Sequence, residues 1–266
     1  VFPVVQEKLH PGSDARRWSA LFPPLALLVL LIPLAQLEEI GWWIWPVVLL
    51  LNLFALAAAA LTRMLVALGA ALLLTLLVLG VAIMQLPSDT LGSGGRELLL
   101  VAGFSIFFCA GAVWLVRRFA GQMAPVPPVW AAYLPDATAA LPFLLLVMLV
   151  FKLPQADPSM IFGVVLLLVA LLYGIAIVSR RGAPVLAAFV GALLVEYCWW
   201  GQLDYPYLAN TDIALVWFTA FALGFLALPF LFRRRVIDLQ PLWAVAALAL
   251  PLHFFLVHRA VGALWP

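Results

Sequence analysis

Charged side chains are scarce in this sequence. Its 266 residues include 14 Lys and Arg and 12 Asp and Glu, which is 10% of the chain, whereas 67% of the residues are hydrophobic. Soluble globular domains carry roughly 25% charged and 45 to 50% apolar residues, so one soluble core cannot bury this much apolar surface. The scarcity of charge therefore excludes a soluble domain and predicts an integral membrane protein.

Cysteine is scarce as well, with only Cys109 and Cys198. Two cysteines so far apart predict neither a disulfide framework nor a metal site, and we expect no cofactor. The glycine-rich stretch 91–95 lacks the Gly-Lys-Ser/Thr continuation of a phosphate-binding loop, so no nucleotide site is expected. The net charge of +2 is spread along the chain and gives no footprint for nucleic acid.

Long uncharged runs, by contrast, are abundant. A helix needs about 20 apolar residues to cross a hydrocarbon layer of roughly 30 Å. The runs are apolar on all sides, unlike the alternating strands of a membrane barrel. The sequence therefore predicts an all-α integral membrane protein with about nine transmembrane helices. The expected spans are 19–37, 40–62, 64–88, 98–116, 137–151, 158–179, 182–201, 213–232 and 239–258.

The basic residues between these spans are unevenly distributed. Of the 14, all but Arg96, Lys152 and Arg259 fall on one side of the membrane. Because Lys and Arg are concentrated in cytoplasmic loops, we expect the N-terminus in the cytoplasm and, after nine crossings, the C-terminus outside. The expected location is the bacterial inner membrane. The lipid bilayer is the expected partner, with other membrane-protein subunits as further candidates.

Polar landmarks recur along the chain at a nearly constant spacing. Arg63 is matched 117 residues later by Arg180, and Gln85 by Gln202 at the same spacing. Four crossings separate the two copies, so they would have the same orientation, and we predict a parallel duplication of a four-helix unit. The predicted organisation is a cytoplasmic segment 1–18, a first four-helix repeat 19–118, a cytoplasmic linker 119–138, a second repeat 139–235, and a ninth helix within 236–266 that looks like the start of a third copy.

Three segments resemble a known family. Leu141–Val147 reads LPFLLLV, Leu228–Arg235 reads LPFLFRRR, and Pro251–Leu256 reads PLHFFL. Together they resemble parts of a family of large, multi-pass bacterial membrane proteins that is catalogued as a domain of unknown function. Family members are usually longer, so the resemblance covers essentially all of this chain but only part of a typical member. It implies a polytopic membrane protein and assigns no catalytic or binding residue.

Two ionisable residues lie deep within predicted spans. Glu196 follows Arg181 by 15 residues and His253 follows Asp238 by 15, which places both about 22 Å along their helices. Ionisable groups within a span are costly and by default mark a functional site or a buried pair. Because the two residues share a depth, they are candidates for a pair.

The role of such a pair stays open at this point. It would be a proton-linked or substrate-coordinating site, with Tyr197 and Asn52 as candidate neighbours. The alternatives are a purely structural hydrogen bond, or a Glu196 that already lies in the outer headgroup region beside Trp199 and Trp200.

Acidic residues also occur in two predicted external loops. Glu38 and Glu39 resemble the acidic residues in the first external loop of lipid-linked sugar transferases, where a carboxylate acts as a base or holds a divalent metal. A second loop runs from Asp204 to Asp212 and contains two tyrosines, Tyr205 and Tyr207, which suit a sugar, a cation or a partner protein. A solvated loop is the alternative in both places.

Three functions follow, none of which involves a residue assigned to catalysis, cofactor binding or metal binding. The leading interpretation is a non-enzymatic structural or accessory membrane component, because few polar groups converge at mid-membrane. A transporter for a small solute or a lipid would bring Glu196, His253 and Asn52 into one cavity. A lipid-linked sugar transferase would place Glu38 or Glu39 in a groove below the 204–212 loop.

Overall fold

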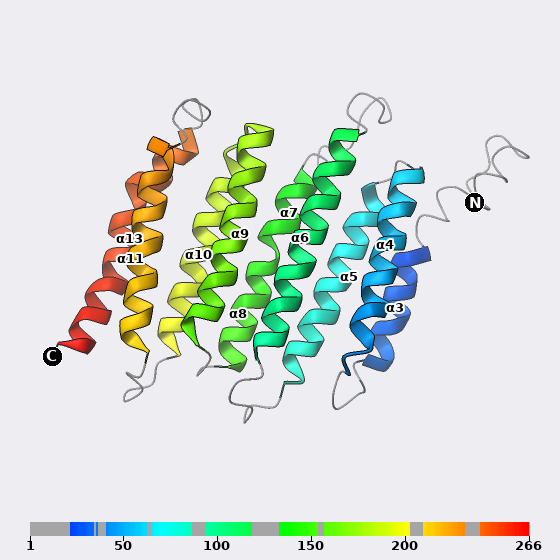
Figure 1. Cartoon of the computed structure of the whole chain (residues 1–266), viewed down its shortest axis with the longest axis horizontal. Helices are drawn as coiled ribbons and strands as arrows, with labels where there is room; N and C mark the ends of the chain where they lie inside the picture. The colour runs from blue at the N-terminus through cyan, green and yellow to red at the C-terminus, as the bar shows by residue number, and fades with distance from the viewer. Residues whose placement is uncertain are drawn as a thin grey trace, which may run out of the picture. The chain divides into compact units, whose positions relative to one another are not determined.

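The computed structural model of this chain describes residues 22–34, 36, 41–62, 65–86, 94–118, 133–153, 157–202, 210–231 and 240–265. Every regular element within these ranges is a helix, as expected (Figure 1). In chain order the helices are α3 (Phe22–Leu34), α4 (Ile44–Thr62), α5 (Leu65–Met84), α6 (Gly94–Arg118), α7 (Leu134–Ala140), α8 (Pro142–Lys152), α9 (Pro158–Ser179), α10 (Ala183–Gly201), α11 (Thr211–Leu231) and α13 (Gln240–Leu264).

Eight segments of the described ranges are long and apolar enough to cross a membrane. Within the first expected span, 19–37, the described residues form α3, whose 13 residues measure about 20 Å, and residues 19–21, 35 and 37 lie outside the described ranges. This length is shorter than a hydrocarbon layer of roughly 30 Å. The predicted helical membrane class is therefore confirmed, whereas the predicted count of nine spans is not.

The fifth expected span, 137–151, is divided into two helices. Helix α7 ends at Ala140 and α8 begins at Pro142. Proline has no backbone N–H to donate to the preceding turn, so an interruption of the helical hydrogen bonds is expected at Pro142, although Leu141 keeps helical backbone angles. Together α7 and α8 cover Leu134–Lys152, which is long enough to span a membrane.

Helix α9 shows how local sequence defines a helix. The Asp157 carboxylate accepts a hydrogen bond from the backbone N–H of Ser159 at 2.8 Å, and Pro158 occupies the first helical position. Both are favoured at a helix start. The helix ends at Arg180, whose φ of 52° is the left-handed conformation that commonly closes helices.

The chain divides into two compact units. The first comprises residues 1–86 and 107–138, and the second comprises 87–106 and 139–266. In the first unit α5 packs against α3 and α4. In the second unit α10 packs against α8, α9 and α13, and α11 packs chiefly against α13, beside which it lies in Figure 1. The parallel duplication of 19–118 and 139–235 stays a prediction.

Aromatic side chains fill much of the core of the second unit. The ring of Phe162 lies 5.7 Å from those of Trp199 and Phe218, and 6.2 Å from that of Phe221, all in edge-to-face geometry. Such contacts contribute beyond simple burial and favour defined positions of the rings. Helices α9, α10 and α11 are thus joined by one aromatic cluster. On α10, the polar residue Glu196 contacts α13.

Candidate functional site

Helices α10 and α13 lie parallel and in register. A methyl group added to Gly182, at the start of α10, would overlap the ring of Pro241 at the start of α13. Further along, the hydroxyl of Tyr197 contacts the backbone of Leu252. Glu196 is 13 residues beyond the first residue of α10, and His253 is 13 residues beyond that of α13. The two therefore sit at the same height, about 20 Å along each helix.

The structure brings Glu196 and His253 together. The Nε2 atom of His253 lies 3.1 Å from Oε2 of Glu196, and both side chains are 0% exposed. The predicted common depth of the two residues is therefore confirmed in its geometry, whereas the alternative that Glu196 lies in the outer headgroup region stays a prediction. A buried pair of this kind is expensive to break, because each partner would be left alone in an apolar interior.

The orientation of the imidazole limits where protons can lie. Nδ1 of His253 lies 2.6 Å from the carbonyl oxygen of Ala249, one turn earlier in α13. Because a carbonyl oxygen only accepts hydrogen bonds, Nδ1 carries a hydrogen. Nε2 then lies against the Glu196 carboxyl group, so a hydrogen bond between the two requires a proton on either the carboxyl or the imidazole.

The surroundings of the pair are apolar and closed. The rings of Phe189 and Phe225 lie 6.1 and 6.2 Å from the imidazole. Oε1 of Glu196 has no hydrogen-bond partner in the described part of the chain, and its Oε2 and the Nε2 of His253 meet as a close pair without the geometry of a directed hydrogen bond. Neither Glu196 nor His253 lines the cavity found in this unit. Among the described residues, the polar groups of Glu196 and His253 therefore contact each other and do not line a cavity that could hold a solute.

Tyr197 strengthens the same helix contact. Its hydroxyl donates a hydrogen bond to the carbonyl oxygen of Leu252 at 2.7 Å. Its ring stacks on that of Phe255 with 6.1 Å between centroids and 6° between planes. The predicted neighbour of Glu196 thus contacts α13 itself, and α10 and α13 are joined by three adjacent interactions.

Asn52 lies in the other unit, on α4. The hydroxyl of Thr75 on α5 donates a hydrogen bond to its Oδ1 at 3.0 Å, and both side chains are fully buried. This bond joins α4 to α5, as polar side chains commonly do between membrane helices. The convergence of Asn52 on Glu196 and His253 stays a prediction.

The structure gives little support for a binding or catalytic site at the acidic loop residues. Glu38, Glu39 and Asp204 lie outside the described residues. Asp212 is exposed in the first turn of α11, where a carboxylate interacts favourably with the helix dipole. The described ranges contain no group of three or more His, Cys, Asp or Glu that would hold a metal.

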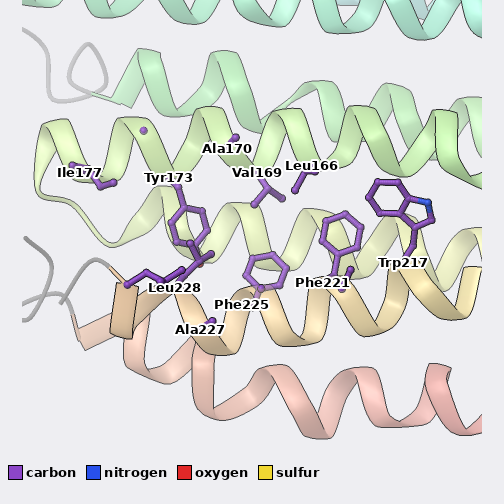
Figure 2. Close-up of a pocket in the computed structure, with 14 residues that line it drawn as sticks. Leu166, Val169, Ala170, Tyr173, Ile177, Trp217, Phe221, Phe225, Ala227 and Leu228 are labelled. Atoms are coloured by element: carbon purple, nitrogen blue, oxygen red, sulfur yellow. The ribbon is translucent and has the colours of Figure 1, made fainter.

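Two features had no place in the sequence-based interpretation. Glu97 on α6 is only 2% exposed and lies 2.7 Å from Nε of Arg96, its neighbour in the chain. The second feature is a cavity of about 450 Å³ between α9 and α11, which Figure 2 shows. Small residues four apart, Ala170 with Gly174 and Ala220 with Gly224, are the one sequence signal that pointed to it.

No protein-family model, no curated protein and no solved structure matches this chain. The resemblance to large multi-pass bacterial membrane proteins therefore stays a prediction, and function has to be inferred from the geometry of the two units.

Proposed function

We propose that this polytopic membrane protein is a non-enzymatic structural or accessory component of its membrane. The observation that supports the proposal is the contact between the side chains of Glu196 and His253, which is closed to solvent. Both side chains are fully buried, and the imidazole is also anchored to its own helix. The most deeply placed ionisable groups of the second unit are thus used to hold two helices together.

The apolar surroundings support a structural role for the pair. A catalytic or transport site needs polar groups that a substrate can reach, and pockets that bind small molecules place a few such groups in an accessible cleft. Here Phe189 and Phe225 pack against the imidazole instead. Polar contacts stabilise the association of membrane helices, because lipid offers the separated groups no alternative hydrogen-bond partner.

A second candidate is a proton-linked transporter for a small solute or a lipid. The observation in its favour is the contact between the Glu196 carboxyl group and the His253 imidazole, because intramembrane groups of these two kinds form the proton relays of pumps and transporters. For the lipid-linked sugar transferase, the described residues offer no comparable support.

Replacing Glu196 with Gln separates the two candidates. The amide of Gln has nearly the shape of the carboxyl group and donates a hydrogen bond to Nε2 of a neutral His253, but it cannot bind or release a proton. A structural role predicts that Glu196→Gln accumulates in the membrane like the wild type and replaces it fully in a host that lacks the gene. Normal accumulation with loss of function would instead establish the transporter.

The location in a bacterial inner membrane, with a cytoplasmic N-terminus and neighbouring subunits, belongs to the same proposal. The asymmetric distribution of Lys and Arg supports the orientation. Large apolar side chains such as Leu99, Val216 and Phe254 are exposed on the helices, which suits contact with lipid or with apolar surfaces of other membrane proteins.

A further inference from the structure

The cavity between α9 and α11 forms because these two helices pack sparsely against each other. Helix α11 packs chiefly against α13 and sparsely against α9. Where they face each other, Ala170 and Gly174 of α9 and Ala220 and Gly224 of α11 contribute almost no side-chain volume. The result is an apolar cavity of about 450 Å³, within the usual range for ligand pockets. We call it the α9–α11 groove.

One buried polar atom lies in this apolar groove. Tyr173 is only 7% exposed, and its hydroxyl has no hydrogen-bond partner among the described residues. Figure 2 shows its ring extending from α9 toward α11, next to Leu228 and Phe225. Buried hydroxyl groups are nearly always hydrogen-bonded, because an unpaired one loses its interaction with water without replacement. The unpaired hydroxyl therefore points to a missing partner in the groove.

The groove is long enough for the upper part of a hydrocarbon tail. Its lining on α9 runs from Leu166 to Ile177, a rise of about 16 Å at 1.5 Å per residue. Tyr173 lies about 10 Å from the Leu166 end of this lining, so a lipid ester beside its hydroxyl leaves about 10 Å of groove for the tail. One leaflet of the hydrocarbon layer is about 15 Å thick, so the rest of the tail extends beyond the groove.

The groove leads to a basic end. Ile177 is one turn before Arg180, whose side chain is exposed. Arg181 follows it directly, so two basic residues stand beyond this end of the lining on α9. Clusters of Lys and Arg at a membrane surface attract anionic lipid headgroups.

We infer that the α9–α11 groove binds one acyl chain of an anionic glycerophospholipid. The chain lies between α9 and α11, an ester oxygen of the lipid accepts a hydrogen bond from the Tyr173 hydroxyl, and the phosphate lies toward Arg180. This binding site goes beyond the structural role proposed above, and it does not depend on the Glu196–His253 pair.

A helix of a second copy is the other candidate occupant. The backbone carbonyls of a helix are already bonded within it, whereas a lipid ester oxygen is free to accept a hydrogen bond from the Tyr173 hydroxyl. The unpaired hydroxyl therefore favours a lipid.

The test is native mass spectrometry of the full chain, released from nanodiscs of phosphatidylglycerol and phosphatidylcholine. We expect one phosphatidylglycerol molecule to remain on each wild-type chain. Gly224→Leu should abolish this retention, because no atom lies within 4 Å of a Cβ at Gly224 and the added side chain would fill the groove. Gly163→Leu is the matched control, since Gly163 on α9 also has open space but does not line the groove. It should retain the lipid.

Tyr173→Phe tests the polar contact separately, because it keeps the ring and removes only the hydroxyl. We expect Tyr173→Phe to bind phosphatidylglycerol with a dissociation constant roughly fivefold higher than that of the wild type. Equal retention by the wild type and Gly224→Leu would overturn the inference, and so would a wild type that retains a second copy of itself or inorganic phosphate alone. None of these results would bear on the role of Glu196 and His253.

Discussion

At the scale of single residues, the account depends on which polar atoms have partners. The Glu196 carboxyl group and the His253 imidazole lie 3.1 Å apart, and the hydroxyl of Tyr197 donates a hydrogen bond to the carbonyl oxygen of Leu252. The hydroxyl of Tyr173 has no partner among the described residues. Because an apolar membrane interior cannot replace a lost hydrogen bond, the first three side chains fix helix positions and the fourth favours a ligand.

The two tyrosines provide a matched comparison of stability. Tyr197→Phe removes the bond to α13 and should lower the free energy of unfolding by about 1 kcal/mol. Tyr173→Phe removes an unpaired hydroxyl and should leave stability equal or higher in lipid-free detergent. Thermal denaturation of both variants in one detergent checks this, and an equal loss in the two would show that the hydrogen bond to Leu252 contributes nothing specific.

The sequence was sufficient to place Glu196 and His253 at one depth, because the rise of a helix per residue is constant. The same counting could not show that α10 and α13 are neighbours, since depth says nothing about which helices pack together. The unpaired state of Tyr173 was out of reach as well. It depends on the side-chain packing between α9 and α11, which no spacing along the chain encodes.

At the scale of helices, close packing depends on particular glycines. A methyl group at Gly191 on α10 would lie 2.7 to 2.8 Å from ring atoms of Phe143 on α8. Real Cβ contacts are longer than this, so the two helices approach closely only because the position is glycine. The break between α7 and α8, by contrast, was predictable in kind from Pro142, although the sequence-based span 137–151 treated the segment as continuous.

Gly191→Ala should therefore destabilise the second unit by about 1 to 3 kcal/mol, the usual cost of overpacking. Gly163→Ala is the control on a neighbouring helix, where a Cβ meets no atom within 4 Å. Melting temperatures from size-exclusion profiles of heated samples measure both effects. If Gly191→Ala and Gly163→Ala have the same melting temperature, the contact between α8 and α10 is less tightly packed than described.

At the scale of the whole molecule, orientation in the membrane is the main open prediction. The helical membrane class followed directly from composition, because no soluble core accommodates 67% hydrophobic residues. The count of nine spans did not follow as securely, since α3 has only 13 residues within the described part of the chain. The predicted orientation is based on the distribution of Lys and Arg, which concentrate in cytoplasmic loops.

Single cysteines at two exposed positions test the orientation. In a background with Cys109 and Cys198 replaced by alanine, Asp212→Cys should react with a membrane-impermeant maleimide in intact spheroplasts. Arg180→Cys should react only after the membrane is permeabilised, because the basic residues are expected in the cytoplasm. The reversed pattern would invert the topology.

The most direct test of the structural role of the Glu196–His253 pair compares Glu196→Leu, His253→Leu and the double variant. Each single change leaves one buried polar partner alone and should cost about 3 to 5 kcal/mol, whereas replacing both should restore the stability. The decisive measurement is the function of the double variant in a host that lacks the gene, relative to its amount in the membrane. The account predicts wild-type function, and a stable double variant without function would contradict it.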